Sequence, residues 1–308
     1  MSKSNDIKKI LDTRVMVLDG AMGTVIQEYQ LTEEDFRGER FKDHPGQLQG
    51  NNDLLSITRP DIIYEIHKRY LEAGADIIET NTFNANTISQ ADYELSDLTY
   101  ELNLESAKLA RKATEDFMKA NPEAQQRFVT GSVGPTNKTL SMSPDVNSPA
   151  YRDVSFMEMA DAYKQQIKGL ADGGVDLLNI ETVFDTLNAK AALFALQEYA
   201  EESGKDIPVI ISGTLVDSAG RTLSGQTLEA FAVSLSFIKP LAVGLNCSTG
   251  ALDMLPHAQR LAQLTDAYVS VYPNAGFPNQ LGEYDQTPEI MGEEIKRFLE
   301  PACVNILG

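Results

Sequence analysis

Val175-Asp176-Leu177-Leu178-Asn179-Ile180-Glu181-Thr182 is a short apolar run that ends in acidic and small polar residues, and runs of this kind decide the fold. Seven others recur along the chain, at Val15 to Leu18, Ile77-Ile78, Phe128-Val129, Val209 to Ile211, Val243 to Leu245, Tyr268 to Val271 and Cys303 to Leu307. Short continuous apolar runs are typical of strands that are buried on both faces of a parallel sheet. The sequence therefore predicts eight such strands.

Amphipathic helical patterns lie between the runs. The clearest begins at Pro60 and stops at Gly74, and a second begins at Ser155 with capping-box spacing. Others span Asp185 to Tyr199 and Thr227 to Phe237. Eight strands that alternate with helices predict an α/β fold, namely a (β/α)8 TIM barrel. A doubly wound open sheet is the alternative.

Polar residues follow nearly every run. In a barrel the carboxyl ends of the strands line one mouth, so side chains that are scattered in the sequence should converge there. These residues are Asp19, Glu79, Thr80, Ser132, Glu181, Ser212, Asn246, Cys247 and Asn274. We therefore expect the chemistry at this mouth.

The composition limits the class of protein. The 308 residues are 42% hydrophobic, which is enough for a large core, and we expect one domain over residues 1–308. No apolar run approaches the roughly 18 residues that span a bilayer, and no signal-peptide core follows the polar start. We expect a cytoplasmic protein without a membrane partner, and two cysteines far apart in sequence suit a reducing compartment. The net charge of −19 argues against binding to nucleic acid.

Asp19 and Glu181 each follow an apolar run, where a carboxylate without a partner is costly to bury. A cation is therefore expected between them. Because the run ends carry almost no basic residues, a substrate ammonium or a metal is favoured over an internal Lys or Arg. Gly20 would let backbone N–H groups approach a carboxylate beside that ammonium. The alternative is that each carboxylate only caps the helix that follows it.

Cys247 follows Asn246 at the end of its run, which places a thiol at the mouth. A cysteine on a buried strand is most often inert packing, and one thiolate is not a zinc site, because zinc takes three or four protein ligands. Cys303 opens the last run, so we expect it to be a packed core residue. No histidine ends a strand, since His44, His67 and His257 fall in a polar connection or in helical stretches.

Longer motifs around these positions resemble those of the homocysteine S-methyltransferase family. They are LDGAMGT at 18–24, ETNTF at 79–83, GSVGPTNKTLS at 131–141, NIETVFDTLNAK at 179–190, ISGT at 211–214, GRTLSGQ at 220–226, GLNC at 244–247 and PNAG at 273–276. The resemblance covers nearly the whole chain. It is strongest to the homocysteine-binding module of the cobalamin-dependent members.

The resemblance implies a TIM barrel with a zinc ion held by one cysteine after strand six and two adjacent cysteines after strand eight. Cys247 matches the first ligand, and the other two are expected beyond Gly308. The 308 residues would then lack the end of strand eight and the final helix, and they would be part of a larger protein that continues into folate and cobalamin modules. The zinc would hold the substrate sulfur deprotonated as a nucleophile.

The implied reaction of the intact parent is methyl transfer from methylcobalamin to L-homocysteine, giving methionine, whereas this piece alone is expected to be inactive. The resemblance places Asp19 and Glu181 at the substrate amino group and the backbone near Gly20 at its carboxylate. It leaves Asn246 as a temporary metal ligand when substrate is absent.

Other functions fit parts of the pattern. A betaine- or S-methylmethionine-dependent homocysteine methyltransferase shares the barrel and cysteines, and a non-catalytic barrel could dock a corrinoid module. A lyase with Mg²⁺ on Asp19, Glu79 and Glu181 leaves Asn246-Cys247 unexplained. Two connections, residues 25–59 and 135–154, exceed the usual length, and either surface elaboration or a role in covering the mouth or docking a partner would explain them.

Overall fold

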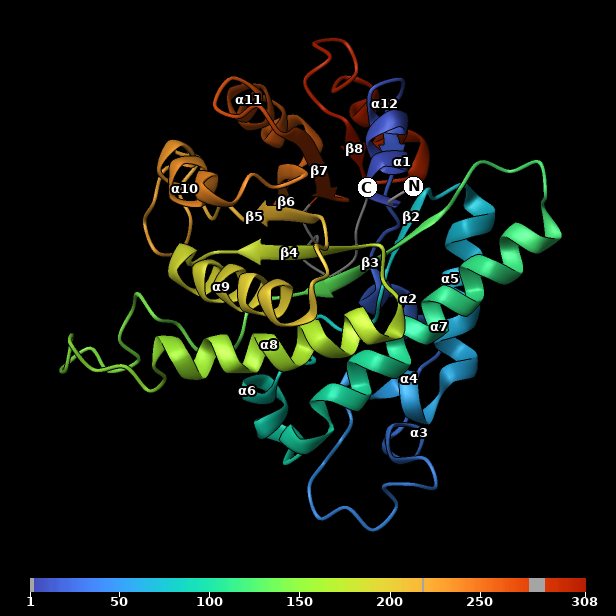
Figure 1. Cartoon of the computed structure of the whole chain (residues 1–308), viewed down its shortest axis with the longest axis vertical. Helices are drawn as coiled ribbons and strands as arrows, with labels where there is room; N and C mark the ends of the chain where they lie inside the picture. Colours follow the sequence, from blue (N-terminus) through green and yellow to red (C-terminus); the bar gives the residue numbers. More distant parts are fainter. Residues whose placement is uncertain (1–2, 218, 277–285) are drawn as a thin grey trace.

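The computed structural model describes residues 3–217, 219–276 and 286–308, and one parallel sheet of eight strands lies at its centre (Figure 1). The strands are β1 (Met16–Val17), β2 (Ile77–Glu79), β3 (Phe128–Val133), β4 (Leu177–Val183), β5 (Val209–Gly213), β6 (Ala242–Gly250), β7 (Tyr268–Asn274) and β8 (Ile306–Leu307). Their order in space is β1-β8-β7-β6-β5-β4-β3-β2, and a parallel bridge between Leu18 and Ile77 joins β1 to β2. The strands therefore follow one another around a ring. This order confirms the predicted TIM barrel and excludes the doubly wound sheet, whose order reverses at a switch point.

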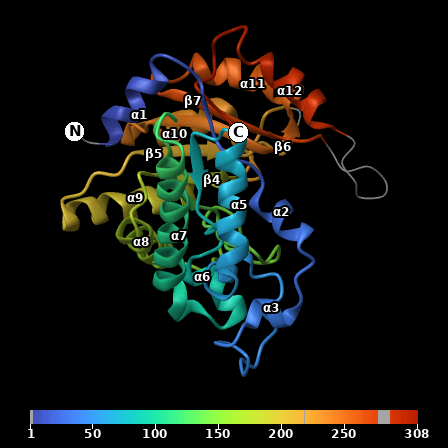
Figure 2. The ribbon, with the colours of Figure 1, turned by 90° about the vertical axis from the view of Figure 1, so that its right-hand side faces the viewer.

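Helices surround the ring, and α5 and α7 lie side by side along one flank (Figure 2). The helices are α1 (Lys3–Leu11), α2 (Met22–Glu28), α3 (Glu33–Arg37), α4 (Leu55–Thr58), α5 (Pro60–Ala73), α6 (Thr87–Gln90), α7 (Thr99–Ala120), α8 (Phe156–Gly173), α9 (Thr186–Ser203), α10 (Leu228–Leu235), α11 (Ala251–Ala262) and α12 (Pro288–Lys296), with 3₁₀ turns η1 (Asn52–Leu54), η2 (Ala91–Tyr93), η3 (Ser96–Leu98) and η4 (Ser236–Ile238). Within the described ranges, none of these helices combines the length and apolar character needed to cross a bilayer.

The predicted helix boundaries are mostly confirmed, because capping signals are local. Pro60 opens α5, and Gly74 ends it in the left-handed region at φ 110°. Ser155 and Glu158 form the predicted capping box of α8. Helix α9 runs beyond the predicted Tyr199, since its stop signal is Gly204 at φ 70°.

The last predicted strand is shorter than its apolar run. Ala302 adopts a left-handed conformation at φ 47°, and pairing with β1 begins only at Asn305, whose carbonyl accepts from Met16 N. Cys303 therefore precedes β8 instead of opening it, and it lies partly buried against the core. In the described part of the chain no helix follows β8, and Val17 on the outward side of β1 is 46% exposed.

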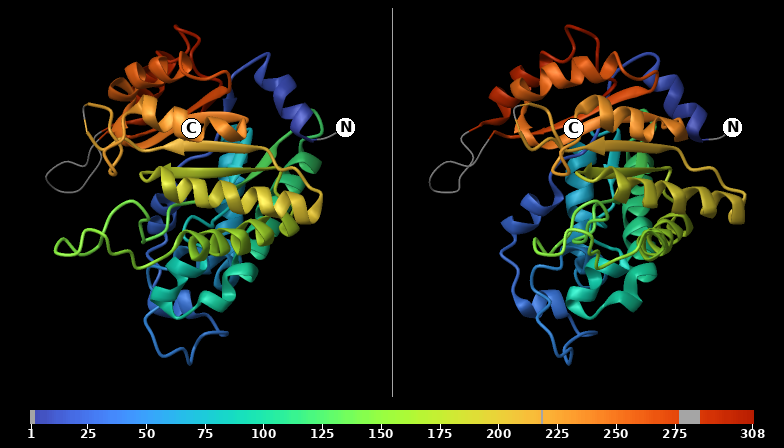
Figure 3. Two further views of the ribbon diagram at one scale, coloured as in Figure 1. Left: turned by 60° about the vertical axis from the view of Figure 1, so that its left-hand side comes forward. Right: turned by 90° about the vertical axis from the view of Figure 1, so that its left-hand side faces the viewer.

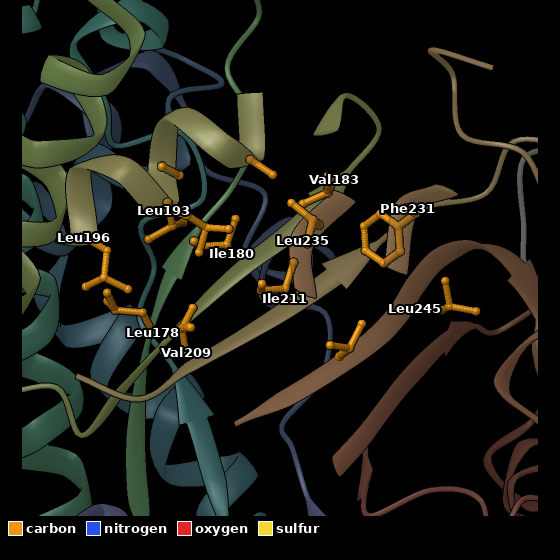
Figure 4. Packing of buried hydrophobic residues seen from close by; sticks show 14 of the residues in the cluster. Leu178, Ile180, Val183, Leu193, Leu196, Val209, Ile211, Phe231, Leu235 and Leu245 are labelled. Atoms are coloured by element: carbon orange, nitrogen blue, oxygen red, sulfur yellow. The ribbon is translucent and has the colours of Figure 1, made fainter. Parts of the chain in front are cut away.

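The main core lies between the barrel and its helices (Figure 4). Outward residues of the strands pack against apolar residues of α9 and α10, and the set labelled there is Leu178, Ile180, Val183, Leu193, Leu196, Val209, Ile211, Phe231, Leu235 and Leu245. Each such side chain contributes roughly 1.5–3 kcal/mol when fully buried. A second cluster fills the barrel at the amino ends of the strands, where Ile7 and Leu11 of α1 join inward residues such as Met16 and Ile77. The interior is thus apolar at that end, and polar groups are left to the opposite mouth.

The two long connections differ from each other. Residues 25–59 contain Leu48, Leu54 and Leu55, all without exposed surface, which pack with α5 and form a core of their own. This segment is therefore packed onto the flank of the barrel, and its role stays a prediction. In residues 135–154, Leu140 and Val154 pack into the main core, whereas the middle of the segment extends away from the barrel (Figure 3), and Val146 is 89% exposed.

Candidate active site

Three carboxyl groups converge inside the mouth. Asp19 follows β1, Glu79 ends β2, and Glu181 lies in β4. Side chains alternate along a strand, so Glu181 shares the inward face of β4 with Leu177 and Asn179. Asp19 and Glu181 are only 6% and 7% exposed, which removes both carboxyl groups from bulk water.

Hydrogen bonds connect these groups into one network. The backbone N–H of Glu79 donates to Asp19 Oδ2 over 2.9 Å. Asn179 Nδ2 donates to Glu79 Oε1 over 2.6 Å and to the hydroxyl of Tyr272 over 2.9 Å. The hydroxyl of Ser132 donates to Glu181 Oε1. Residues from five strands or strand ends thereby hold the carboxyl groups in place.

Within the part of the chain that the structure describes, no Lys or Arg side chain is buried with these carboxyl groups as a cationic partner. Burial, together with the charge of Glu79, raises the pKa of Asp19 and of Glu181 well above its usual value. Burial also raises the pKa of Glu79 to about 7. A cationic ligand would reverse these shifts, since an opposite charge favours the ionised form.

Two buried oxygens of this network have no hydrogen-bond partner. They are Asp19 Oδ1 and Asn179 Oδ1. The amide oxygen of Asn179 can only accept a hydrogen bond, and the same holds for Asp19 Oδ1 when Asp19 is ionised. Unpartnered buried acceptors are costly, so they favour a ligand that brings N–H donors. An ammonium group offers three donors and the missing positive charge.

Packing against α5 also explains why position 20 is a glycine, in addition to the predicted approach of backbone N–H groups to a ligand. A Cβ at this position would lie 3.1 Å from the hydroxyl of Tyr70 on α5. The next helix, α2, begins without a side-chain hydrogen bond from its N-cap Ala21. The predicted approach of backbone N–H groups to a ligand carboxylate stays a prediction.

Asn246 and Cys247 lie in the carboxyl-terminal half of β6. Asn246 has no exposed surface, and its Nδ2 donates to Thr182 Oγ1 over 2.8 Å and to Cys247 Sγ over 3.1 Å. Its Oδ1 accepts from Thr182 N over 3.0 Å and from the hydroxyl of Ser212 over 2.7 Å. Cys247 is partly exposed, and burial raises the pKa of its thiol.

The described residues do not form a zinc site by themselves. Within residues 3–217, 219–276 and 286–308, no group of three or more His, Cys, Asp or Glu side chains is arranged to hold a metal. Cys303 lies before β8, at the opposite end of the barrel from Cys247, and its Sγ is 3.9 Å from the carbonyl of Phe298. His67 and His257 lie in α5 and α11, as predicted. The zinc assignment therefore stays a prediction.

A family model described as homocysteine S-methyltransferase matches residues 16–308. The chain belongs to this family. Among solved structures it is similar to the homocysteine methyltransferase MmuM from Escherichia coli. The metallated form matches with a TM-score of 0.75 at 24% identity, over 98% of this chain and 93% of that chain. The oxidised form matches with a TM-score of 0.76 at 24% identity and the same coverage. At this identity the structures support the fold.

In this member of the homocysteine S-methyltransferase family, the structure brings together most of the predicted mouth residues. Asp19, Glu79, Ser132 and Glu181 share one network, and Ser212, Asn246 and Cys247 share a second. Thr80 is different, because its hydroxyl accepts from Ser132 N and pairs with Thr82. It ties β2 to β3. For Asn274, the described contacts place its backbone beside Gly250 of β6.

Sequence reasoning missed two residues of the carboxyl network, Tyr272 and Asn179. Tyr272 is partly buried, its hydroxyl lies beside Asn179, and a hydrogen bond from it lowers the pKa of Glu181 against the larger effect of burial. The sequence does contain a pattern that places both side chains on the inward face of their strands. Asn179 lies two residues before Glu181, and Tyr272 lies two and four residues after Ser270 and Tyr268, so alternation along the strand predicts an inward direction.

Proposed function

We propose that this chain binds L-homocysteine at the barrel mouth and serves the transfer of a methyl group to the homocysteine sulfur. The cluster of three carboxyl groups carries this proposal, since Asp19 and Glu181 are buried, Glu79 is half-buried, and no Lys or Arg among the described residues is buried beside them. The substrate ammonium takes the place of the missing cation and contacts Asp19, Glu79 and Glu181. The substrate carboxylate lies toward the backbone of Gly20, and the sulfur lies toward Cys247.

We also propose that Cys247 is one of three thiolate ligands to zinc, as the resemblance implies. The other two would come from residues joined to Gly308. Gly308 N donates to Val271 O over 3.0 Å, and a Cβ on Gly308 would lie 3.2 Å from Asp19 O. A residue joined to Gly308 therefore emerges at the same mouth as Cys247. The metallated form of MmuM supports metal binding in a similar barrel.

The methyl donor is proposed to be methylcobalamin, held by another module of a longer cytoplasmic parent of the methionine synthase type. The segments 131–141 and 179–190 resemble that branch of the family most closely. Val146 and Tyr151, 89% and 52% exposed on the long connection after β3, offer an apolar surface for cobalamin and folate modules of the same parent. A betaine- or S-methylmethionine-dependent enzyme and a non-catalytic docking barrel remain the alternatives.

Isothermal titration of the 308-residue chain with L-homocysteine tests the substrate assignment. The matched ligand is 4-mercaptobutyrate, which lacks only the ammonium group. We expect clearly weaker binding of 4-mercaptobutyrate, and a matching loss of homocysteine affinity in Glu181→Gln. Glu115→Gln, an exposed position on α7, is the control. Equal affinity for the two ligands would remove the carboxyl cluster from the substrate site.

The donor is tested separately in a longer parent protein that carries the proposed extra cysteines. Methionine formation is measured with methylcobalamin, betaine and S-methylmethionine offered one at a time. Turnover with methylcobalamin alone supports the proposal. Turnover with either of the others identifies an alternative donor, and no turnover with any donor favours the docking barrel.

A further inference from the structure

Two residues at the mouth have strained backbones. Thr182 and Cys247 adopt left-handed conformations, with φ of 54° and 56°. Such angles are uncommon for any residue other than glycine, and a β-branched residue like threonine is a clear outlier there. Each strained residue costs of order 1–3 kcal/mol and persists only where its surroundings hold it.

Both residues lie where a strand changes register. The pairing of β4 with β5 shifts between Ile180 and Val183, and the pairing of β6 with β7 shifts between Asn246 and Gly250. Irregularities of this kind redirect side chains and are common beside active sites. Here they aim one threonine and one thiol toward the same part of the mouth.

Asn246 connects the two irregularities. Strands β4 and β6 are separated by β5, and the carboxamide of Asn246 has partners on all three strands. It accepts from Thr182 N and from Ser212 Oγ, and it donates to Thr182 Oγ1 and to Cys247 Sγ. A carboxamide has two donor hydrogens and two acceptor lone pairs, so its capacity is fully used.

We infer that Asn246 is a positioning residue, which clamps the strained segments of β4 and β6 together and thereby sets the location of the Cys247 thiol. Because no donor or acceptor is left over, Asn246 acts through Thr182, Ser212 and Cys247 without touching a ligand. This role differs from the direct ligand contact that the sequence suggested. Its purpose rests on the proposed function, since Cys247 matters only if the thiol takes part in the reaction.

The clamp is tested by comparing the reaction rates of the two thiols with iodoacetamide in the native protein, measured peptide by peptide by mass spectrometry. Cys303 lies outside the clamp and is the internal reference. We expect Asn246→Ala to change the Cys247-to-Cys303 rate ratio by roughly threefold or more, because the thiol loses its hydrogen bond and its fixed backbone. The ratio needs neither zinc nor substrate, so it reports on the clamp even if the proposed function is wrong.

Two threonine variants keep the test valid if Asn246→Ala does not fold. Thr182→Val retains the shape but loses the hydroxyl, which accepts from Asn246 and also contacts the Cys247 thiol. We expect the ratio to move in the same direction as in Asn246→Ala, and the Cys247 backbone measured below separates the clamp from the direct contact. Thr182→Ser retains the hydroxyl and should keep the ratio of the unmodified protein. Asn103→Ala, on α7, removes a buried asparagine that donates to Ala85 O and Thr99 O, and it controls for general destabilisation.

Crystal structures of the same variants give the second measurement. We expect Cys247 to leave the left-handed region in Thr182→Val and to stay there in Thr182→Ser. An unchanged rate ratio together with an unchanged Cys247 backbone in Thr182→Val overturns the inference. A ratio that moves equally in Asn103→Ala also overturns it, because the effect would then be general loss of stability.

Discussion

The backbone N–H of Glu79 donates to Oδ2 of Asp19 over 2.9 Å, which holds two carboxyl groups side by side at the closing point of the barrel. Burial and the charge of Glu79 raise the pKa of Asp19. Burial alone raises the pKa of Glu79 to about 7. Near neutral pH the empty cluster therefore retains protons, and these must leave before a positively charged ligand binds with full strength.

This linkage predicts pH-dependent ligand affinity. L-Methionine is a suitable probe, because its thioether does not titrate. We expect its dissociation constant to be lower at about pH 8 than at about pH 6, by roughly three- to tenfold, since the carboxyl groups are more fully ionised at the higher pH. Glu79→Gln should reduce the difference. Titration calorimetry at both pH values measures it, and an affinity that is equal or weaker at the higher pH contradicts the expectation.

The buried carboxyl group of Asp53 should make the stability of the folded protein depend on pH. This residue of η1 is 4% exposed, and burial raises its pKa to about 7, although Asn84 N donates to its carboxylate over 3.0 Å. A raised carboxyl pKa means that the folded state retains a proton which the unfolded chain releases. Stability is then lost as pH rises from the unfolded pKa of 3.8 through about 7.

Asp53→Asn should therefore increase the free energy of unfolding at about pH 8, by roughly 1–3 kcal/mol, and the gain should shrink toward about pH 5. Urea denaturation at the two pH values measures both. The matched control is Asp97→Asn, because Asp97 has the same place in η3 but is exposed. A gain that does not depend on pH would show that burial of the charge is not the cause.

The sequence predicts those parts of the fold that depend on neighbouring residues. Pro60, Gly74 and the Ser155 capping box act within one helical turn, so the helix starts and stops agree with the structure. The eight apolar runs likewise locate the strands and, with them, the mouth. Alternation along β4 and β7 would also have located Asn179 and Tyr272.

Other features depend on contacts between distant segments. The core formed by residues 25–59 depends on Leu48 and Leu54 meeting α5, and no local pattern in that polar stretch indicates this contact. The partners of Asn246 lie on β4 and β5, 64 and 34 residues away in sequence. Neither the left-handed conformation of Thr182 nor that of Cys247 follows from residue type, because both residues ordinarily avoid it.

Two glycines predict opposite effects of the same substitution. Gly173 ends α8, and a Cβ there would lie 2.8 Å from Leu104 O and press on the side chain of Ala107 in α7. We expect Gly173→Ala to lower the free energy of unfolding by roughly 1–3 kcal/mol through overpacking. Gly292 in α12 has no atom within 4 Å of the same added group. Gly292→Ala should therefore stabilise by up to about 1 kcal/mol, as expected from helix propensity. Urea denaturation measures the free energy of unfolding of both variants. If it falls in both variants or rises in both, the packing described for α7 and α8 is contradicted.

Zinc content tests the metal assignment directly. One thiol at the mouth is too few for a structural or catalytic zinc site, so we expect the 308-residue chain to retain well below one equivalent of zinc after dialysis. A longer protein that continues past Gly308 with two adjacent cysteines should bind one equivalent. In that protein Cys247→Ser should abolish stoichiometric binding, and Cys303→Ser should leave it intact, because Cys303 lies at the other end of the barrel. Atomic absorption after dialysis measures all four proteins. Tightly held, stoichiometric zinc in the 308-residue chain would rule out the three-cysteine site, because no second cysteine reaches Cys247 in the described structure.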